Sequence, residues 1–261
     1  MTVSEGRMRV VICESPAQVG RYVGAQAAEA LNHALRGPTA RARLLLATGA
    51  SQLEVLADLV TQPVDWPRVE AFHLDEYIGL PADHPASFRR YLKERVANLV
   101  PLDMHWIEPG SPRALEELAR LLAGRAPDVA LVGIGENGHL AFNDPPADLA
   151  TNEVLLEVEL DQACRAQQVR EGWFPELESV PSRAVTMSVP AVLRSERILA
   201  AVPGEAKAAI VARALGAEEV TAELPASSLL AHRDATVVLD RASSRLLSPT
   251  ARARAVSPYE M

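Results

Sequence analysis

Long apolar runs, cysteines and lysines are all scarce in this chain of 261 residues. No run approaches the roughly 20 consecutive apolar residues of a transmembrane helix, and the first residues, MTVSEGRMRVVIC, lack the apolar core of a secretory signal. The two cysteines, Cys13 and Cys164, are too few for a disulfide framework. We therefore expect a cytoplasmic protein without a membrane association.

A basic excess is also absent, because 26 basic residues stand against 34 acidic ones and give a net charge of −8. This balance argues against nucleic acid as the main partner, although a local basic pocket could still hold one small anion. Lys93 and Lys207 are the only lysines, so arginine supplies nearly all of the positive charge. Each of the two lysines is present either by chance or because its position needs the compact charge of an ammonium group.

What the sequence does contain is a regular alternation of short apolar runs with helical patterns. Hydrophobic residues make up 48% and charged residues 23%, a mix that excludes a mainly disordered chain, a collagen and a coiled coil. Several runs are apolar throughout, as in strands that are buried on both faces of a parallel sheet. The predicted strands are Arg9–Cys13, Arg43–Ala47, Val69–Leu74, Val129–Gly133, Ala184–Met187, Ile198–Val202 and Thr236–Leu239.

This alternation predicts an α/β fold with a mainly parallel sheet. Neither a linker nor a break in composition divides the chain, so we expect one domain over residues 1–247, followed by a loosely ordered tail at 248–261. Ligands of open parallel sheets bind beyond the carboxyl ends of the strands. The loops that follow the predicted strands are therefore the places to look for a site.

The loop after the second predicted strand reads Thr48-Gly49-Ala50-Ser51 and leads into a helix that is expected to begin near Gln52. The N-terminus of a helix offers unpaired N–H groups to a phosphate, and Gly49 would allow a close backbone approach. The alternative is that Ser51 simply caps the helix.

The loop after the third predicted strand carries Asp75 and Glu76 in the segment VEAFHLDEYIGL. Extended residues alternate in direction, so the two carboxylates are expected to have different roles. One of them could act as a general base. The alternative is that the pair is solvated or caps the next helix.

The loop after the fourth predicted strand reads GIGENGHLAFNDP and carries three glycines before His139. The spacing differs from the dinucleotide-binding fingerprint, because the third glycine is misplaced and His139 stands where a packed helix should begin. A histidine held in a glycine-rich turn near Asn137 and Asp144 is a candidate acid or base. A purely structural histidine remains the alternative.

Other chemistries have less support in the sequence. His73, His139 and Asp75 lack the close ligand spacing of a metal site, so no metal is predicted. The G-x-S-x-G elbow of a serine hydrolase is absent. Cys164 follows no catalytic pattern, since no histidine lies near it in the sequence.

Taken together, ATGAS, FHLDEYIGLPADHPASFRRYL, GIGENGHLAFNDP and PGEAKA make the chain resemble the glucosamine-6-phosphate deaminase (isomerase) family. The resemblance extends over about residues 10–246, and CRAQQVREGWF is similar to the mobile lid of the family. It implies a Rossmann-like sheet with helices on both faces, and the conversion of glucosamine 6-phosphate and water into fructose 6-phosphate and ammonium. It also implies a reaction without metal or organic cofactor.

The resemblance further implies roles for individual residues. Asp75 matches the base that moves a proton between C2 and C1, and His139 matches the base that opens the pyranose ring. Asn137 and Asp144 match partners of that histidine, although most members have Glu where this chain has Asp144, so the contact to His139 could be longer or bridged by water. The phosphate and substrate contacts would come from Thr48, Gly49, Ala50, Ser51, Gly138, Arg170 and Lys207.

Three alternatives stay open. The first is 6-phosphogluconolactonase, a lactone hydrolase that shares the implied fold and the glycine–histidine loop but needs no base at C2. The second is a deaminase for the C4 epimer, galactosamine 6-phosphate. The third is a sugar-phosphate-binding regulator that has lost catalysis. The expected partner is a small sugar phosphate, and the chain could form a homo-oligomer.

Overall fold

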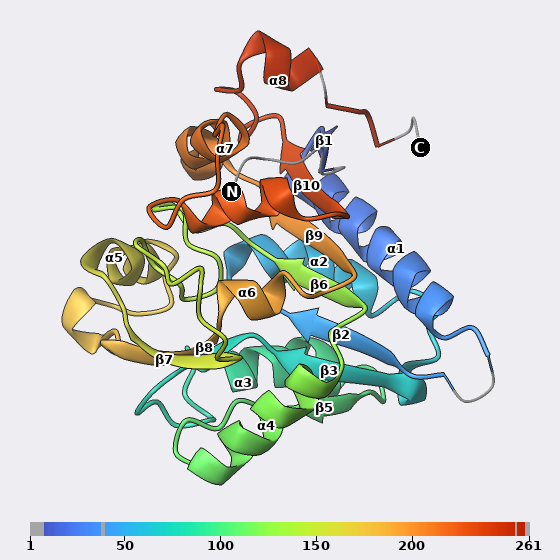
Figure 1. The fold of residues 1–261 in the computed structure, drawn as a ribbon, viewed down its shortest axis with the longest axis vertical. Helices are drawn as coiled ribbons and strands as arrows, with labels where there is room; N and C mark the ends of the chain where they lie inside the picture. The colour runs from blue at the N-terminus through green and yellow to red at the C-terminus, as the bar shows by residue number, and fades with distance from the viewer. Residues whose placement is uncertain (1–7, 38–39, 254, 259–261) are drawn as a thin grey trace.

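Six of the seven predicted apolar runs and one short strand that was not predicted form a parallel sheet of seven strands in the computed structural model, which describes residues 8–37, 40–253 and 255–258. The strand order is β1-β10-β9-β6-β2-β3-β5, and Figure 1 shows the central strands descending from β10 through β9, β6 and β2 to β3. The strands are β1 (Arg9–Cys13), β2 (Ala42–Leu46), β3 (Val69–His73), β5 (Asp103–His105), β6 (Val129–Val132), β9 (Arg197–Val202) and β10 (Ala235–Asp240).

Helices cover both faces of this sheet because side chains alternate along each buried strand. In β2, for example, Leu45 belongs to one apolar cluster, whereas Leu44 and Leu46 belong to the other. One face packs against α1 (Pro16–Ala34), α2 (Leu53–Leu59) and α3 (Phe88–Leu92). The opposite face packs against α4 (Pro112–Gly124), α6 (Val189–Val192) and α7 (Ala208–Leu215).

A smaller antiparallel sheet of three strands, β4-β8-β7, lies beside the main one (Figure 1). It contains β4 (Asp75–Tyr77), β7 (Leu155–Glu159) and β8 (Arg183–Met187), and helix α5 (Gln162–Arg170) connects β7 to β8. Only Leu74 separates β3 from β4. Its N–H donates to the carbonyl of Leu46 in the main sheet (3.1 Å), and its carbonyl accepts from Met187 in the small sheet (2.9 Å).

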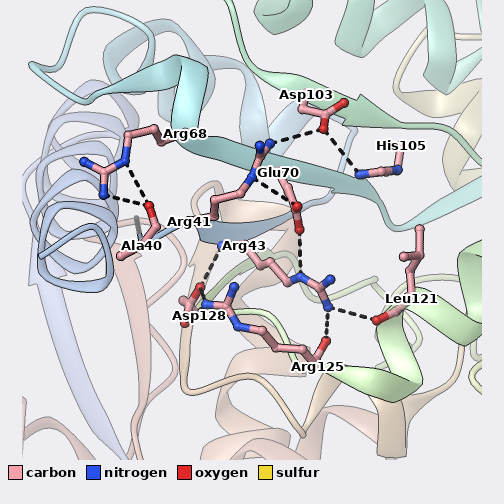
Figure 2. A network of polar contacts seen from close by, with 10 residues as sticks. All are labelled: Ala40, Arg41, Arg43, Arg68, Glu70, Asp103, His105, Leu121, Arg125 and Asp128. Carbon is pink, nitrogen blue, oxygen red and sulfur yellow. Dashed lines mark hydrogen bonds and ion pairs between the residues drawn. The ribbon is translucent and has the colours of Figure 1, made fainter. Parts of the chain in front are cut away.

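A polar network ties together the ends of β2, β3 and β6 that lie farthest from the carboxyl edge of the sheet (Figure 2). The buried Arg43 donates from Nε to Glu70 (2.9 Å) and from Nη1 to the carbonyl of Leu121 (2.8 Å). Its backbone N–H donates to Asp128 (2.7 Å), which also pairs with Arg125. The guanidinium of Arg43 thereby joins two strands to the end of α4.

The predicted α/β class, with a mainly parallel sheet and helices on both faces, is confirmed. All seven predicted strands are present with ends shifted by at most one residue, whereas β4, β5 and β7 were not predicted. β4 and β5 have three residues each, and β7 is half-exposed, so none produces an apolar run.

Beyond residue 247, the chain forms α8 (Pro249–Ala253), and the N–H of Val256 donates to the carbonyl of Val10 (2.9 Å) along strand β1. The single domain over 1–247 and the loose order of the tail remain predictions. In the described part of the chain, no helix combines the length and the apolar character that crossing a membrane requires.

Candidate active site

A cavity of about 480 Å³ opens at the carboxyl ends of β2, β3, β6 and β9. β2 and β6 are neighbours in the sheet, but the chain leaves β2 toward β3 on one side and later leaves β6 toward β9 on the other. A reversal of this kind is where open α/β sheets bind their ligands. The predicted site residues that line the cavity are Thr48, Gly49, Ala50, Ser51, Asp75, His139, Arg170 and Lys207.

Asp75 lies at the start of β4, where the register with β8 places it opposite Thr186. The side chain lines the cavity, although the residue is only 5% exposed, and its Oδ1 has no hydrogen-bond partner among the described residues. Burial, and secondarily the charge of Glu76, raises the pKa of Asp75 to about 8. A carboxylate in such a place can accept a proton near neutral pH.

Glu76 points away from the cavity, as the alternation of extended residues predicts. One carboxylate oxygen accepts from the Ser87 hydroxyl (2.9 Å) and the N–H of Arg89 (2.9 Å), and the other accepts from the N–H of Phe88 (3.2 Å). These bonds satisfy donors at the start of α3. The capping alternative therefore holds for Glu76, while Asp75 faces the cavity.

His139 is held by its own loop. The strand–turn residue Gly135 lies directly beneath the imidazole ring, so that a Cβ atom at position 135 would overlap the ring of His139. On the other side, Nδ1 of His139 lies 3.1 Å from Oδ1 of Asp144. The contact is direct although the side chain of Asp144 is short, so it requires neither a greater distance nor a bridging water.

Asn137 and Asp144 form hydrogen bonds with His139 but do not line the cavity themselves. The amide of Asn137 donates to Asp144 (2.8 Å) and Asp161 (3.0 Å), and its oxygen accepts from the N–H of His139 (3.1 Å). The N–H of Asp161 donates to the second oxygen of Asp144 (3.0 Å). Burial raises the pKa of Asp144, but the hydrogen bonds from His139, Asn137 and Asp161 outweigh it, so the pKa lies below its usual value.

Gly138 also lies outside the cavity lining. Its φ of +96° belongs to the left-handed region, and a Cβ there would lie 2.7 Å from Leu224. Its N–H donates to Gly135 (3.0 Å) and its carbonyl accepts from Ala226 (2.9 Å). The structure thus places Gly138 within the loop that holds His139.

The Thr48–Ser51 turn forms a wall of the cavity. Gly49 has a φ of +95°, and its carbonyl accepts from the hydroxyl of Tyr91 (3.0 Å). A short 3-10 helix, Ala50–Gln52, precedes α2, and neither helix has a side-chain cap. The alternative that Ser51 serves as a plain cap is therefore wrong, which leaves its hydroxyl in the cavity wall beside the amide of Gln52 (3.2 Å).

Two cations face this turn. Lys207 follows β9 and is only 8% exposed, yet it makes no ion pair within the described residues. Burial lowers the pKa of Lys207, whereas the nearby carboxylates of Glu171 and Glu136 raise it, and the net shift is downward. Arg170, at the end of α5, is half-exposed and pairs with Glu136.

Sequence reasoning missed several cavity residues on or next to α5. Gln167 and Glu171 line the cavity together with Glu136, and Asp161 begins α5 as its N-cap. A signal for Glu136 was available, since it lies in the same glycine-rich loop as His139. The others depend on how α5 packs across the cavity, which no local pattern encodes.

A group of possible metal donors is formed by His139, Asp144 and Cys164, whose ligand atoms lie within 4.8 Å of one another. Burial, reinforced by the charges of Asp144 and Asp161, raises the pKa of the Cys164 thiol far above its usual value. The thiol is therefore protonated, and Asp144 already accepts several hydrogen bonds. His73, the other histidine that was considered for a metal site and not predicted as a ligand, is fully buried, and its Nδ1 accepts from the N–H of Ile107 (3.4 Å).

Comparison with known proteins agrees with this geometry. Residues 14–238 match the family model of glucosamine-6-phosphate isomerases/6-phosphogluconolactonase. The chain is 34% identical over 206 residues to a glucosamine-6-phosphate deaminase of Streptococcus pneumoniae. The aligned region covers 77% of this chain and 86% of the relative.

Solved structures show the same fold. A monomeric glucosamine-6-phosphate deaminase superposes with a TM-score of 0.82 at 27% identity, over 92% of this chain and 100% of that one. A 6-phosphogluconolactonase of Trypanosoma brucei superposes with a TM-score of 0.73 at 16% identity, over 93% and 100% of the two chains. The chain belongs to the family of glucosamine-6-phosphate isomerases and 6-phosphogluconolactonases.

Proposed function

We propose that the protein converts glucosamine 6-phosphate and water into fructose 6-phosphate and ammonium. The observation that carries this proposal is Asp75, a buried carboxylate in the wall of a cavity that also contains His139 and Lys207. Burial of an unpartnered carboxylate is costly for a protein. Its retention at this place is understandable when the reaction requires a base in a site shielded from water.

Ring opening is assigned to His139. The imidazole takes the proton of the C1 hydroxyl, the bond between C1 and the ring oxygen breaks, and the ring oxygen takes that proton from the imidazolium. Asp144 orients the ring and stabilises the positive charge that His139 acquires, because Nδ1 faces the carboxylate at 3.1 Å. Asn137 fixes both partners through its amide group.

Isomerisation is assigned to Asp75. Once the chain of the sugar is open, the carboxylate removes the proton from C2 and returns it to C1. One proton passes from the protonated amino group to the C1 oxygen, which leaves a protonated imine at C2. Water adds to the imine and ammonium departs. A pKa of about 8 makes the carboxyl group a stronger base than an ordinary aspartate while keeping it active near neutral pH.

The phosphate is assigned to the Thr48–Ser51 turn and Lys207, with Arg170 at the mouth of the cavity. Backbone N–H groups of the turn and the buried ammonium of Lys207, which pairs with no carboxylate in the described part of the chain, are complementary to a dianion. Because the phosphate is remote from C1 and C2, its binding energy serves to orient the reacting carbons.

The proposal is tested by measuring ammonium release from glucosamine 6-phosphate alongside hydrolysis of 6-phosphogluconolactone by the same preparation. Ammonium and fructose 6-phosphate should appear in equal amounts, and the lactone should be hydrolysed no faster than without enzyme. The reverse result would assign the protein to the lactonases, whose reaction needs neither a base at C2, the role proposed for Asp75, nor an amine at C2.

Two narrower alternatives need the same assay with more substrates. Galactosamine 6-phosphate differs at C4 alone, and its rate relative to the glucosamine substrate decides the preference. A regulator would bind the sugar phosphate tightly without turning it over. The direct contact between His139 and Asp144 supports catalysis, since the shortened side chain was the one feature that favoured a regulator.

The proposed reaction uses no metal or organic cofactor, and its partner is a small sugar phosphate. We place the protein in the cytoplasm, which cell fractionation would test. Light scattering of the purified protein would decide between a monomer and a homo-oligomer.

A further inference from the structure

Glu171 stands directly in front of the proposed phosphate subsite. Its side chain lines the cavity, and its Oε2 atom lies 4.0 Å from the position that a Cβ would have on Gly49. Among the charged groups around Lys207, the same carboxylate has the largest electrostatic effect on its pKa, which it raises. A negative group therefore faces both the backbone turn and the ammonium that are proposed to receive the phosphate.

The carboxylate is held in this place by its neighbours. Oε1 of Glu171 accepts from the amide of Gln167 (2.6 Å), and Oε2 accepts from the indole N–H of Trp173 (3.1 Å). Gln167 lies in α5 and Trp173 follows it, so these contacts fix the carboxylate relative to the α5 segment. The position of Glu171 is thus built by specific hydrogen bonds and is not that of a free surface side chain.

Arg170 has a counter-ion of its own. Its guanidinium pairs with Glu136, and the backbone N–H of Glu136 donates to the side-chain oxygen of Gln167 (3.0 Å). Both cations of the subsite consequently face carboxylates in the absence of a ligand. Two acidic groups and two basic groups give the subsite little net positive charge.

This arrangement conflicts with a bound phosphate dianion. A carboxylate close to a phosphate is repelled by it, and inside a partly buried cavity the repulsion is stronger than in water. Glu171 must then either leave its place or reduce the affinity of the subsite.

On the basis of the proposed phosphate subsite, we propose that Glu171 is a built-in competitor that occupies the front of this subsite and is displaced when the phosphate of the substrate binds. Phosphate would bind the N–H groups of the turn and the ammonium of Lys207, while Glu171 moves away and its hydrogen bonds with Gln167 and Trp173 break. The residue sets how tightly the phosphate group is bound.

The test is a calorimetric titration of the full chain with inorganic phosphate and with fructose 6-phosphate. Glu171→Gln keeps the size of the side chain and removes its charge, so both ligands should bind roughly tenfold more tightly, as about 1.4 kcal/mol of lost repulsion produces. Glu171→Asp keeps the charge, but its side chain is one methylene shorter and withdraws the carboxylate from Gln167 and Trp173. If the Asp variant tightens binding as much as the Gln variant, charge is not the cause and the proposal fails.

Glu176→Gln serves as the matched control, because it removes the same charge from an exposed position a few residues farther along. Its affinity for phosphate should stay close to that of the wild type, since an exposed charge is screened by salt. Equal phosphate affinity of the wild type and Glu171→Gln would overturn the competitor role and leave the deaminase assignment untouched. A wild type that binds no phosphate would instead overturn the subsite itself.

Trp173 gives an independent readout of the displacement. Its indole N–H donates to Glu171, so that displacement of the carboxylate should change the fluorescence of this tryptophan. The signal is isolated by subtracting the response of Trp173→Phe to the same titration. No difference between the two proteins at saturating fructose 6-phosphate would mean that Glu171 stays in place, contrary to the proposal.

Discussion

His139 and Asp144 contact each other directly, with 3.1 Å between Nδ1 of the imidazole and Oδ1 of the carboxylate. The second oxygen of Asp144 accepts from the backbone of Asp161, and the first also accepts from Asn137. Asp144 is thus held on both oxygens, and its short side chain reaches the histidine without a bridging group. The arrangement makes the carboxylate a fixed partner of the imidazole.

Asp144→Asn should therefore slow ring opening more than it weakens binding. The amide can still contact Nδ1, but it no longer stabilises the positive charge that His139 acquires. We expect the pH–rate profile to shift and kcat to fall, with KM for glucosamine 6-phosphate little changed. A variant with the rate and pH profile of the wild type would show that Asp144 has no part in the reaction.

Asp75→Asn should abolish turnover while leaving the affinity for fructose 6-phosphate intact. General-base contributions amount to about 10²–10⁴-fold, so a loss of that size in kcat is expected. Incorporation of solvent deuterium into fructose 6-phosphate in the presence of ammonium should disappear as well. Glu76→Gln is the adjacent comparison, and a dead Glu76→Gln beside an active Asp75→Asn would mean that the two carboxylates were assigned the wrong way round.

The raised pKa of Asp75 also gives the sign of two pH effects. As a base it acts when deprotonated, so kcat/KM should rise with pH up to about 8. The folded state holds the proton over a range in which the unfolded state, with the ordinary pKa of 3.8, has released it. Stability should therefore fall as pH rises between these two values, and this fall should be smaller in Asp75→Asn.

Gly135→Ala tests the support beneath His139. The added methyl group would overlap the imidazole ring, which must then move away from its place in the cavity wall. A displacement of about 1 Å at a catalytic group can cost on the order of 100-fold in rate, so kcat should fall by about that factor. Gly110→Ala adds the same methyl group in open space and should leave the rate unchanged. Full activity of the Gly135 variant would exclude a fixed imidazole.

Lys207→Ala tests the phosphate anchor. Removal of a partly desolvated charge from a charge pair costs about 2–5 kcal/mol, so fructose 6-phosphate and inorganic phosphate should bind roughly 30-fold more weakly or worse. The remaining affinity should also depend less on salt. Lys93→Ala removes the other lysine at an exposed position and should have no such effect. Wild-type phosphate affinity in the Lys207 variant would place the anchor elsewhere.

Arg43→Met tests stability at the opposite end of the sheet. The substitution removes the guanidinium from the carbonyls of Leu121 and Arg125 and from Glu70, which keeps its pair with Arg41. Buried acceptors that lose their donor cost about 1–3 kcal/mol, so we expect a loss of that size. Denaturant unfolding should show this loss, while KM at low temperature stays unchanged because the cavity lies at the other edge. Arg241→Met breaks the exposed pair with Glu14 and should cost at most about 1 kcal/mol.

The sequence was sufficient for six of the seven strands of the main sheet, because each of these six is an apolar run and a strand buried on both faces needs such a run. The exception is the three-residue edge strand β5. β7 escaped notice because alternate residues such as Glu157 and Glu159 face outward and interrupt the run. β4 was read as a loop, since Asp75 and Glu76 mark a polar turn in any local pattern. Their place in a second sheet depends on pairing with residues more than a hundred positions away.

Much of the candidate site could also be anticipated, because the loops after neighbouring parallel strands must meet at one edge. Thr48, Asp75, His139 and Lys207 come from four such loops and line the same cavity. Glu171 could not be anticipated in this way. Its position in front of Gly49 follows from the packing of α5 across the cavity, a tertiary relationship that leaves no periodic trace in the sequence.

Leu74 is the one residue between the two sheets, and its N–H and carbonyl are bonded to a strand of each. Rotation about its backbone would break both bonds, so the direction of Asp75 is determined when the chain folds. In the proposed reaction, the sugar consequently meets a base whose orientation is already fixed, and no conformational entropy is lost by ordering that base at the moment of binding. The affinity of the phosphate group remains available for bringing the sugar to the carboxylate.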